Sequence, residues 1–276
     1  MAVPLYATSG ERIWYYSHRV ICGAVLLFLI APILAIMPLS FNSVPFFTYP
    51  MPGYSLRWYE DFFLTERWQG ALRNSIFVAT SVTILATTLG TLAALGLSRP
   101  NFPFRTAVMS LLISPIIVPV VITAVAVYFF YADVGLLNTY AGLILAHTVL
   151  ATPFVVITVT ATLMGFHHSL SRAAAGLGAP PWTVFFKVIL PLILPGMISG
   201  ALFAFGTSFD ETVVVLFVVS AEQRTLPKVM FSGIREMISP TITAAATILI
   251  LFAVAMLTTV ELLRRRSERL RGIRPT

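Results

Sequence analysis

Long uninterrupted apolar segments constrain this chain more than any other feature. Six segments can be read, each near the roughly 20 residues that a helix needs to cross the hydrocarbon core of a bilayer. They cover approximately residues 20–41, 74–97, 106–131, 140–164, 188–207 and 240–262. Only 11% of the 276 residues are charged, whereas a soluble domain carries about 25%. We therefore predict an all-α, polytopic membrane protein with six transmembrane helices.

The basic residues are unevenly divided between the two sides that this topology creates. If both termini face the cytoplasm, that side holds 12 of the 18 Lys and Arg residues but only 3 of the 11 acids. Cytoplasmic loops carry an excess of Lys and Arg, so we predict a multi-pass protein with both termini cytoplasmic. The basic tail at 264–276 then marks topology and contacts lipid headgroups, and no nucleic-acid partner is needed to explain it.

The cysteine and histidine content argues against two kinds of site. Cys22 is the single cysteine, so an intrachain disulfide or a thiolate metal site cannot form. The four histidines, His18, His147, His167 and His168, show no ligand spacing. We therefore predict no metal site.

The connection between the fourth and fifth segments has a pattern of its own. It reads SRAAAGLGAPPWTVFFKVILP over residues 171–191. Ser169 or Ser171 can cap a short alanine-rich helix, Gly178 can supply the left-handed residue that ends it, and the following proline pair can open a second helix. We expect a helix, a tight turn and another helix on the cytoplasmic side.

This connection resembles the EAA loop of binding-protein-dependent ABC importer permeases, whose pattern is Glu-Ala-Ala, three residues, Gly, nine residues and Ile-x-Leu-Pro. The matching residues are Ala173, Ala174, Gly178, Leu190 and Pro191. Val188 stands where the family has Ile, and Arg172 stands where it usually has Glu, which reverses the charge. The resemblance implies a coupling helix between spans four and five that sits in a cleft of a separate cytoplasmic ATPase.

The resemblance extends over roughly residues 70–263, which implies a type I ABC permease domain there. The preceding segment, 1–69, then contains the first transmembrane helix and an outer loop over about 43–70. The chain is most similar to the spermidine/putrescine-type permeases, on the strings SFDE at 208–211, TLP at 225–227 and SPTITA at 239–244.

Membership of that family implies a bacterial inner membrane complex. Its partners would be a second permease subunit, two copies of an ATPase subunit that bind ATP and Mg, and a periplasmic or external solute-binding protein. The sequence contains no Gly-x-x-x-x-Gly-Lys-Ser/Thr phosphate loop. We therefore expect no enzymatic activity and no cofactor in this chain itself.

Two adjacent acids, Asp210 and Glu211, follow the fifth segment. An acid at the centre of a span costs about 2.5 to 3.5 kcal/mol, so acids near membrane depth are candidate functional groups. The apolar stretch Val213–Val219 after them predicts a helix break around Gly206–Asp210 that lines a cavity. The alternative is a solvated pair that ends a helix. By the resemblance, one of the acids receives a cationic solute, to which Phe209 can add a cation–π face.

The predicted function is a translocation pathway for polyamines or a related small organic cation. Another small solute, such as an amino-acid derivative, an opine or ferric ion, is an alternative cargo. A stand-alone secondary transporter could use Asp210, Glu211 and His147 as an ion relay, but it would run without ATP and no internal repeat is evident. An intramembrane enzyme would need a nucleophile and a base at suitable spacing, which the sequence does not offer. We expect His147 to bond to a neighbouring helix instead.

Overall fold

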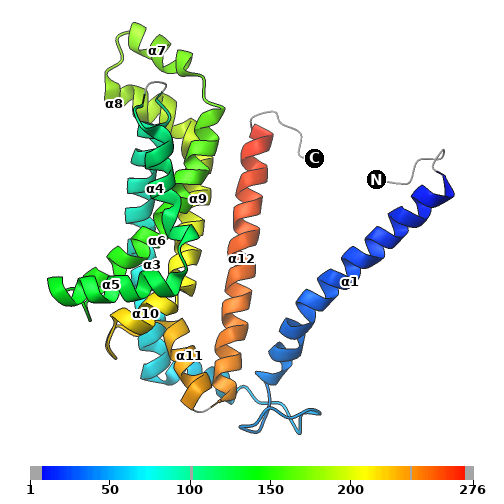
Figure 1. Cartoon of the computed structure of the whole chain (residues 1–276). Coiled ribbons are helices and arrows are strands. Elements are labelled where there is room, and N and C mark those ends of the chain that lie inside the picture. The colour runs from blue at the N-terminus through cyan, green and yellow to red at the C-terminus, as the bar shows by residue number, and fades with distance from the viewer. Residues whose placement is uncertain (1–7, 100–101, 237, 271–276) are drawn as a thin grey trace. The chain divides into compact units, whose positions relative to one another are not determined.

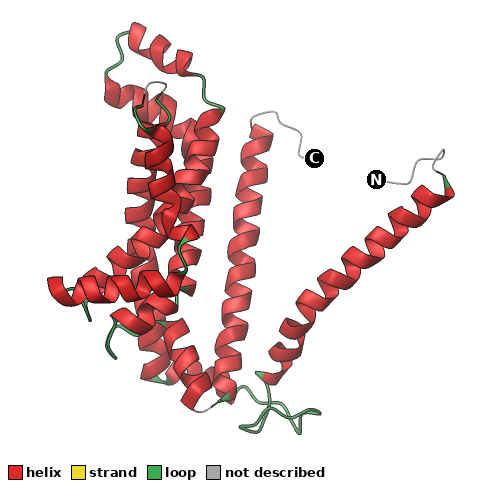
Figure 2. Cartoon of the chain, in the orientation of Figure 1, coloured by secondary structure: helices red, strands yellow, loops and turns green. Residues whose placement is uncertain are grey.

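The computed structural model describes residues 8–99, 102–236 and 238–270, and its regular elements are helices (Figure 1; Figure 2). Within these ranges the only β pairing is the isolated bridge between Asn42 and Tyr54. The all-α fold is therefore confirmed. In chain order the elements are α1 (Ser9–Leu39), α2 (Arg57–Leu64), α3 (Glu66–Leu97), α4 (Arg105–Ile117), α5 (Val120–Val134), α6 (Tyr140–Met164), α7 (His168–Gly176), α8 (Pro181–Val184), the π-helix η1 (Phe185–Ile189), α9 (Leu190–Asp210), α10 (Val213–Val218), α11 (Leu226–Glu236) and α12 (Pro240–Leu270).

The described chain has five helical segments long and apolar enough to cross a membrane, or six if α4 and α5 count as one broken span. The predicted span over 106–131 is interrupted, because α4 and α5 meet at a bend of 101°. Pro119 causes this break. It has no N–H to donate, and it forces Val118 into an extended conformation with ψ of 131°.

The chain divides into two compact units, which we describe separately. The first contains α1, most of α2 and the beginning of α12. No residue of α1 is buried, as expected for a helix whose solvent is lipid. Polar bonds order the residues after it: Trp58 Nε1 donates to the Asn42 carbonyl at 2.6 Å, and Thr241 Oγ1 donates to Asp61 Oδ2 at 2.8 Å. Within the predicted outer loop, about 43–70, the chain forms α2 and the start of α3.

The core of the second unit is built from α3, α6 and α9, which pack against one another (Figure 1). Small residues allow this close approach, as they do between many membrane helices. A Cβ atom on Gly90 of α3 would lie 2.7 Å from Val155 Cβ of α6, and one on Gly200 of α9 would lie 2.6 Å from Thr158 Oγ1. The glycines therefore let the three backbones approach around the fully buried Val155.

The same unit has two different ends (Figure 1). At one end α7 and α8 link α6 to α9, and we call this the α7 end. At the other end α9 breaks into α10, which packs against α5 and α6 and is followed by α11. We call this the α10 end. The predicted coupling loop lies at the α7 end and the predicted acids lie at the α10 end.

Candidate functional site

The link between α6 and α9 is a short helical hairpin. At the end of α7 the Gly178 N–H donates to the Ala175 carbonyl at 3.0 Å and the Ala179 N–H donates to the Ala174 carbonyl at 3.1 Å. This pair of bonds is a Schellman motif, and its left-handed position is Gly178, with φ of 82°. Pro181 then opens α8, where its missing N–H is not needed. The predicted order of helix, tight turn and helix is observed.

The predicted serine cap of α7 is wrong. The helix begins at His168, with the extended residue His167 in the N-cap position, and no side chain bonds to its first N–H groups. The helix starts early because α6 ends at Met164 and the chain turns within three residues. Ser169 and Ser171 therefore lie inside α7.

The side chains of the loop motif face two ways. Arg172 and Ala173 are exposed, whereas Ala174 is half-buried. The helix α7 itself contacts α8 and η1. The turn and α8 present large apolar side chains outward: Leu177 is 90% exposed and Trp182 is 74% exposed. Trp182 also stacks on Phe186, with 6.1 Å between the ring centroids. We call Leu177, Trp182 and Phe186 the apolar rim, and exposed apolar clusters of this kind mark interaction surfaces.

Leu190 and Pro191, the other end of the motif, lie where α8 passes into α9. The chain forms one π-turn here, and the Leu190 N–H donates to the Phe185 carbonyl, five residues back. Pro191 explains the turn, because it cannot donate to the carbonyl four residues before it and the helix widens around the missing bond. Residues Pro181–Asp210 still form a single candidate span. A continuous helical path therefore joins the hairpin to Asp210.

A small cavity of about 180 Å³ lies where α6 passes into α7. Its walls are Thr162, Gly165, Phe166, His167, Leu170, Leu192 and Ile193. The start of the hairpin is thus not packed solidly against α9.

The two acids occupy different positions at the α10 end. Asp210 is the last residue of α9 and its side chain is exposed. Glu211 has an extended backbone, with ψ of 117°, so the helix breaks after Asp210 and not within the predicted range Gly206–Asp210. Gly206 remains helical because its intrinsic penalty, about 1 kcal/mol, is small against tertiary packing. Glu211 Oε1 accepts a hydrogen bond from the Val214 N–H at 3.0 Å and so caps α10.

The short helix α10 is held at its other end by groups that the sequence reasoning missed. The Asn138 N–H donates to the Val218 carbonyl at 2.9 Å. Lys228 Nζ, from α11, donates to the Val219 carbonyl at 2.7 Å and to the Val215 carbonyl at 3.3 Å. A cation is favourable at a helix C-terminus. The hydrophobic periodicity gives no sign that a lysine of α11 would bind the carbonyl groups at the end of α10.

Partial burial acts on the Lys228 ammonium as well. Desolvation, followed by the positive charge of Arg224, lowers the pKa of Lys228 below its ordinary value. The side chain is therefore a weaker base than a solvated lysine, although its two carbonyl contacts favour the ammonium form.

Phe209 belongs to an aromatic cluster. Its ring stacks on Phe205 at 5.5 Å with an interplanar angle of 17°, and the ring of Phe252 lies 5.5 Å away on α12. The stacked face of Phe209 is covered by Phe205. Any cation–π contact must therefore use the remaining face.

His147 joins α6 to the last turn of α9. It is fully buried, and its Nδ1 lies 3.0 Å from Ser208 Oγ, so the expected bond to a neighbouring helix is observed. Its Nε2 has no hydrogen-bond partner among the residues that the structure describes. Because Ser208 precedes Asp210 by two residues, this bond holds the turn that carries the exposed acid.

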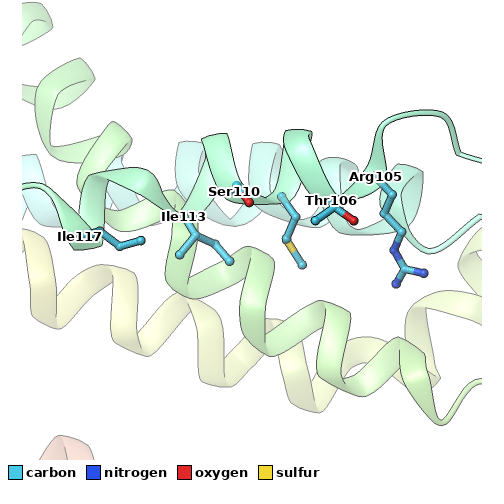
Figure 3. A pocket seen from close by; sticks show the side chains of 6 residues that line it. Arg105, Thr106, Ser110, Ile113 and Ile117 are labelled. Carbon is cyan, nitrogen blue, oxygen red and sulfur yellow. The ribbon is translucent and has the colours of Figure 1, made fainter.

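A groove of about 480 Å³ runs along α4. It is lined by Arg105, Thr106, Met109, Ser110, Ile113 and Ile117, and Figure 3 shows these residues along one helix, with Arg105 at one end. One helix forms only one wall, so lipid or another chain must supply the opposite wall. In the ranges 8–99, 102–236 and 238–270, no three His, Cys, Asp or Glu side chains are grouped to hold a metal ion.

Comparison with known sequences identifies a family match. The profile of the family described as "Binding-protein-dependent transport system inner membrane component" matches residues 86–270. The spermidine/putrescine transport system permease protein PotC of Haemophilus influenzae is 32% identical over 254 residues, which cover 92% of this chain and 98% of the relative. The putrescine transport system permease protein PotI of Escherichia coli is 33% identical over 234 residues, 81% of this chain and 82% of the relative. The molybdenum transport system permease protein ModB of Mycobacterium bovis is 29% identical over 203 residues, 68% and 76% of the two chains.

Solved structures share the fold at lower sequence identity. A bacterial ABC transporter involved in the import of the acidic polysaccharide alginate contains a chain with a TM-score of 0.74 and 17% identity, over 94% of this chain and 99% of that one. An amino acid ABC transporter with histidines gives a TM-score of 0.57 and 15% identity, over 76% and 98%. At these identities the likeness concerns the fold alone.

Proposed function

The chain belongs to the binding-protein-dependent transport system inner membrane components, and from this premise we propose that it forms the translocation pathway of an ATP-driven importer for polyamines or a similar small organic cation. Members of this family are transport components of the inner membrane and not enzymes. The ion-coupled transporter and the intramembrane enzyme are therefore set aside.

The observation that carries the choice of solute is the similarity to PotC over 92% of this chain and 98% of that protein. The exposed Asp210 agrees with it, because a carboxylate at the end of a span attracts an ammonium group. The similarity to the molybdenum permease ModB covers less of both chains. A molybdenum oxyanion would moreover be repelled by the same carboxylate.

We assign different roles to the two acids, and their different surroundings support this assignment. Asp210 is exposed, follows Phe209 of the aromatic cluster in the sequence, and is the proposed solute contact. Glu211 is engaged in capping α10. A single exposed acid makes a weak site, which suits a permease because the solute must also leave.

The hairpin at the α7 end is the proposed contact with the ATPase. Arg172, Ala173, Ala174, Gly178, Leu190 and Pro191 are its motif residues, and the apolar rim beside them needs a partner surface. ATP and Mg would bind in two copies of that ATPase. A second permease subunit and an external solute-binding protein complete the proposed complex. One related fold has been solved as the alginate transporter in complex with an alginate pentasaccharide-bound periplasmic protein.

The proposed orientation places both termini and the hairpin in the cytoplasm, as the bias in Lys and Arg favours. The proposed permease domain, residues 70–263, overlaps the family match over 86–270. The proposed basic tail at 264–276 lies partly outside the described residues, which end at Leu270.

The test is uptake by proteoliposomes that contain the complex purified through a tag on this chain. We expect uptake of labelled putrescine or spermidine that requires ATP on the ATPase side and the external binding protein. Molybdate, amino acids and ferric ion should not compete. Uptake without ATP, or uptake of molybdate in place of polyamine, would overturn the proposal.

A further inference from the structure

The two loops on the proposed cytoplasmic face carry only positive formal charge. No Asp or Glu occurs between Asp133 and Asp210, nor between Glu66 and Asp133. Both connections on this face, 98–105 and 165–187, therefore lack acids altogether. Their cations Arg99, Arg105, Arg172 and Lys187 are all exposed.

Arg172 is the cation in the middle of α7. Residues three and four positions along a helix share a face, so Arg172 lies with Ala175 and Gly176, both also exposed. The C-terminal part of this face is therefore a small smooth patch beside the long cationic side chain of Arg172. Such a patch lets the backbone of another protein come close. A lipid headgroup does not need a small, smooth surface, so the patch favours a protein partner.

The sign of this charge constrains the partner. Like charges placed across an interface are strongly unfavourable, and complementary charges fix register and partner choice. The nearest acids in the sequence, Asp133 and Asp210, are 39 and 38 residues from Arg172. A partner surface that covers α7 is therefore expected to supply an acid for this exposed cation.

From this arrangement we propose that Arg172 docks against a carboxylate in the α7-binding cleft of the partner ATPase, and that this pair selects the cognate ATPase. The inference rests on the proposed function, since it assumes that an ATPase covers the hairpin. It adds the chemistry of the cleft: an acidic contact for Arg172, an apolar wall for the rim of Leu177 and Trp182, and room for the small face of α7.

The test uses the ATPase that co-purifies with the tagged wild-type chain. Binding of that ATPase is measured to the wild-type permease and to Arg172→Lys, Arg172→Gln and Arg172→Glu in nanodiscs of neutral lipid and of lipid with phosphatidylglycerol. Arg99→Glu is the matched control, because it makes the same charge change on the same face outside α7. We expect Arg172→Glu to weaken binding about tenfold or more, Arg172→Gln to weaken it less, and Arg172→Lys to weaken it least.

Further readouts separate the explanations. The loss in Arg172→Glu should be the same in both lipids, and an acid-to-arginine change in the ATPase cleft should restore binding. Equal binding by Arg172→Glu and the wild type would overturn the proposal, as would a loss that appears only with anionic lipid or equally in Arg99→Glu. If the wild-type chain brings down no ATPase, the proposed function itself fails. If the ATPase binds normally and its affinity does not change when Arg172 is substituted, only this inference fails and the proposed function stands.

Discussion

The helical path of the second unit is interrupted at both the α7 end and the α10 end, but different side chains are left exposed at the two ends. At the α10 end the local polar groups are used internally: Glu211 caps α10, Lys228 closes it and His147 holds Ser208. Asp210 is exposed at the end of α9, and Glu222 and Arg224 are exposed in the connection from α10 to α11. At the α7 end the backbone is closed by Gly178, whereas Arg172 and the apolar rim face outward.

This contrast indicates two kinds of surface. The α10 end is a preformed frame beside the exposed Asp210, which fits transient contact with a small cation. The α7 end is a stable turn that presents large apolar and cationic side chains, which fits a lasting contact with another protein. The continuous helical segment Pro181–Asp210 joins the two ends.

The largest effect is expected at the turn of the α7 end. Gly178→Val places a β-branched residue at φ of 82°, where L-residues are penalised by about 1 to 2 kcal/mol. ATP-driven uptake should fall about tenfold or more while the amount of inserted chain stays the same. Gly96→Ala, on α3, is the control, because a Cβ atom there meets no atom within 4 Å. Equal uptake by the two variants would show that the shape of the turn is unimportant.

The second prediction separates the two acids at the α10 end. Asp210→Asn should raise the KM for a polyamine about tenfold, since a hydrogen bond to a charged group contributes about 1.5 to 3 kcal/mol, and should leave the melting temperature unchanged. Glu211→Ala should lower the free energy of unfolding by about 1 kcal/mol through the lost cap. Uptake kinetics and thermal melting of the purified complex measure the two effects. If the two phenotypes are exchanged, the assignment of the acids is reversed.

A smaller effect is expected where α6 meets α9. Ser208→Ala removes the partner of His147 Nδ1 and should lower the free energy of unfolding by about 1 kcal/mol. Ser199→Ala, on the same helix and half-buried, is the control. Because Ser208 holds the turn before Asp210, the KM for polyamine should also rise slightly. A melting temperature that stays at the wild-type value would mean that the bond does not hold this turn.

The smallest effect concerns Lys228 and pH. Its pKa is lowered in the fold by burial and Arg224, so between the folded and unfolded pKa values the unfolded chain binds more protons. The free energy of unfolding should therefore rise with pH in that alkaline window. Lys228→Met should remove this rise, whereas Lys228→Arg should keep a cation on the carbonyls. Melting curves between neutral and alkaline pH measure it, and an identical slope in Lys228→Met would contradict the assignment.

Features that depend on local sequence could be predicted. Apolar length gave the spans, and Gly178 with the proline pair gave the helix, turn and helix at the α7 end. The bend at Pro119 was also readable in principle, because proline after Val118 breaks a helix, but the apolar run 106–131 concealed it. The cap of α7 was misplaced because both serines are good caps in isolation, whereas the end of α6 decides where the next helix begins.

Contacts between distant segments could not be predicted. The bonds of Lys228 and Asn138 to α10 join elements whose proximity follows only from tertiary packing. The sequence indicated Asp210 and Glu211 as candidates, of which one was expected to contact the solute. Only the structure shows that one caps a helix while the other is exposed, since a break one residue earlier would have exchanged their surroundings.

The central claim is that the α10 end meets the solute and the α7 end meets the ATPase. The most direct test is the number of ATP molecules hydrolysed per polyamine imported, measured across solute concentrations for the wild type, Asp210→Asn and Gly178→Val. Asp210→Asn should raise the KM at an unchanged ratio, and Gly178→Val should raise the ratio at an unchanged KM. If both variants shift the same parameter, the two ends do not have separate roles.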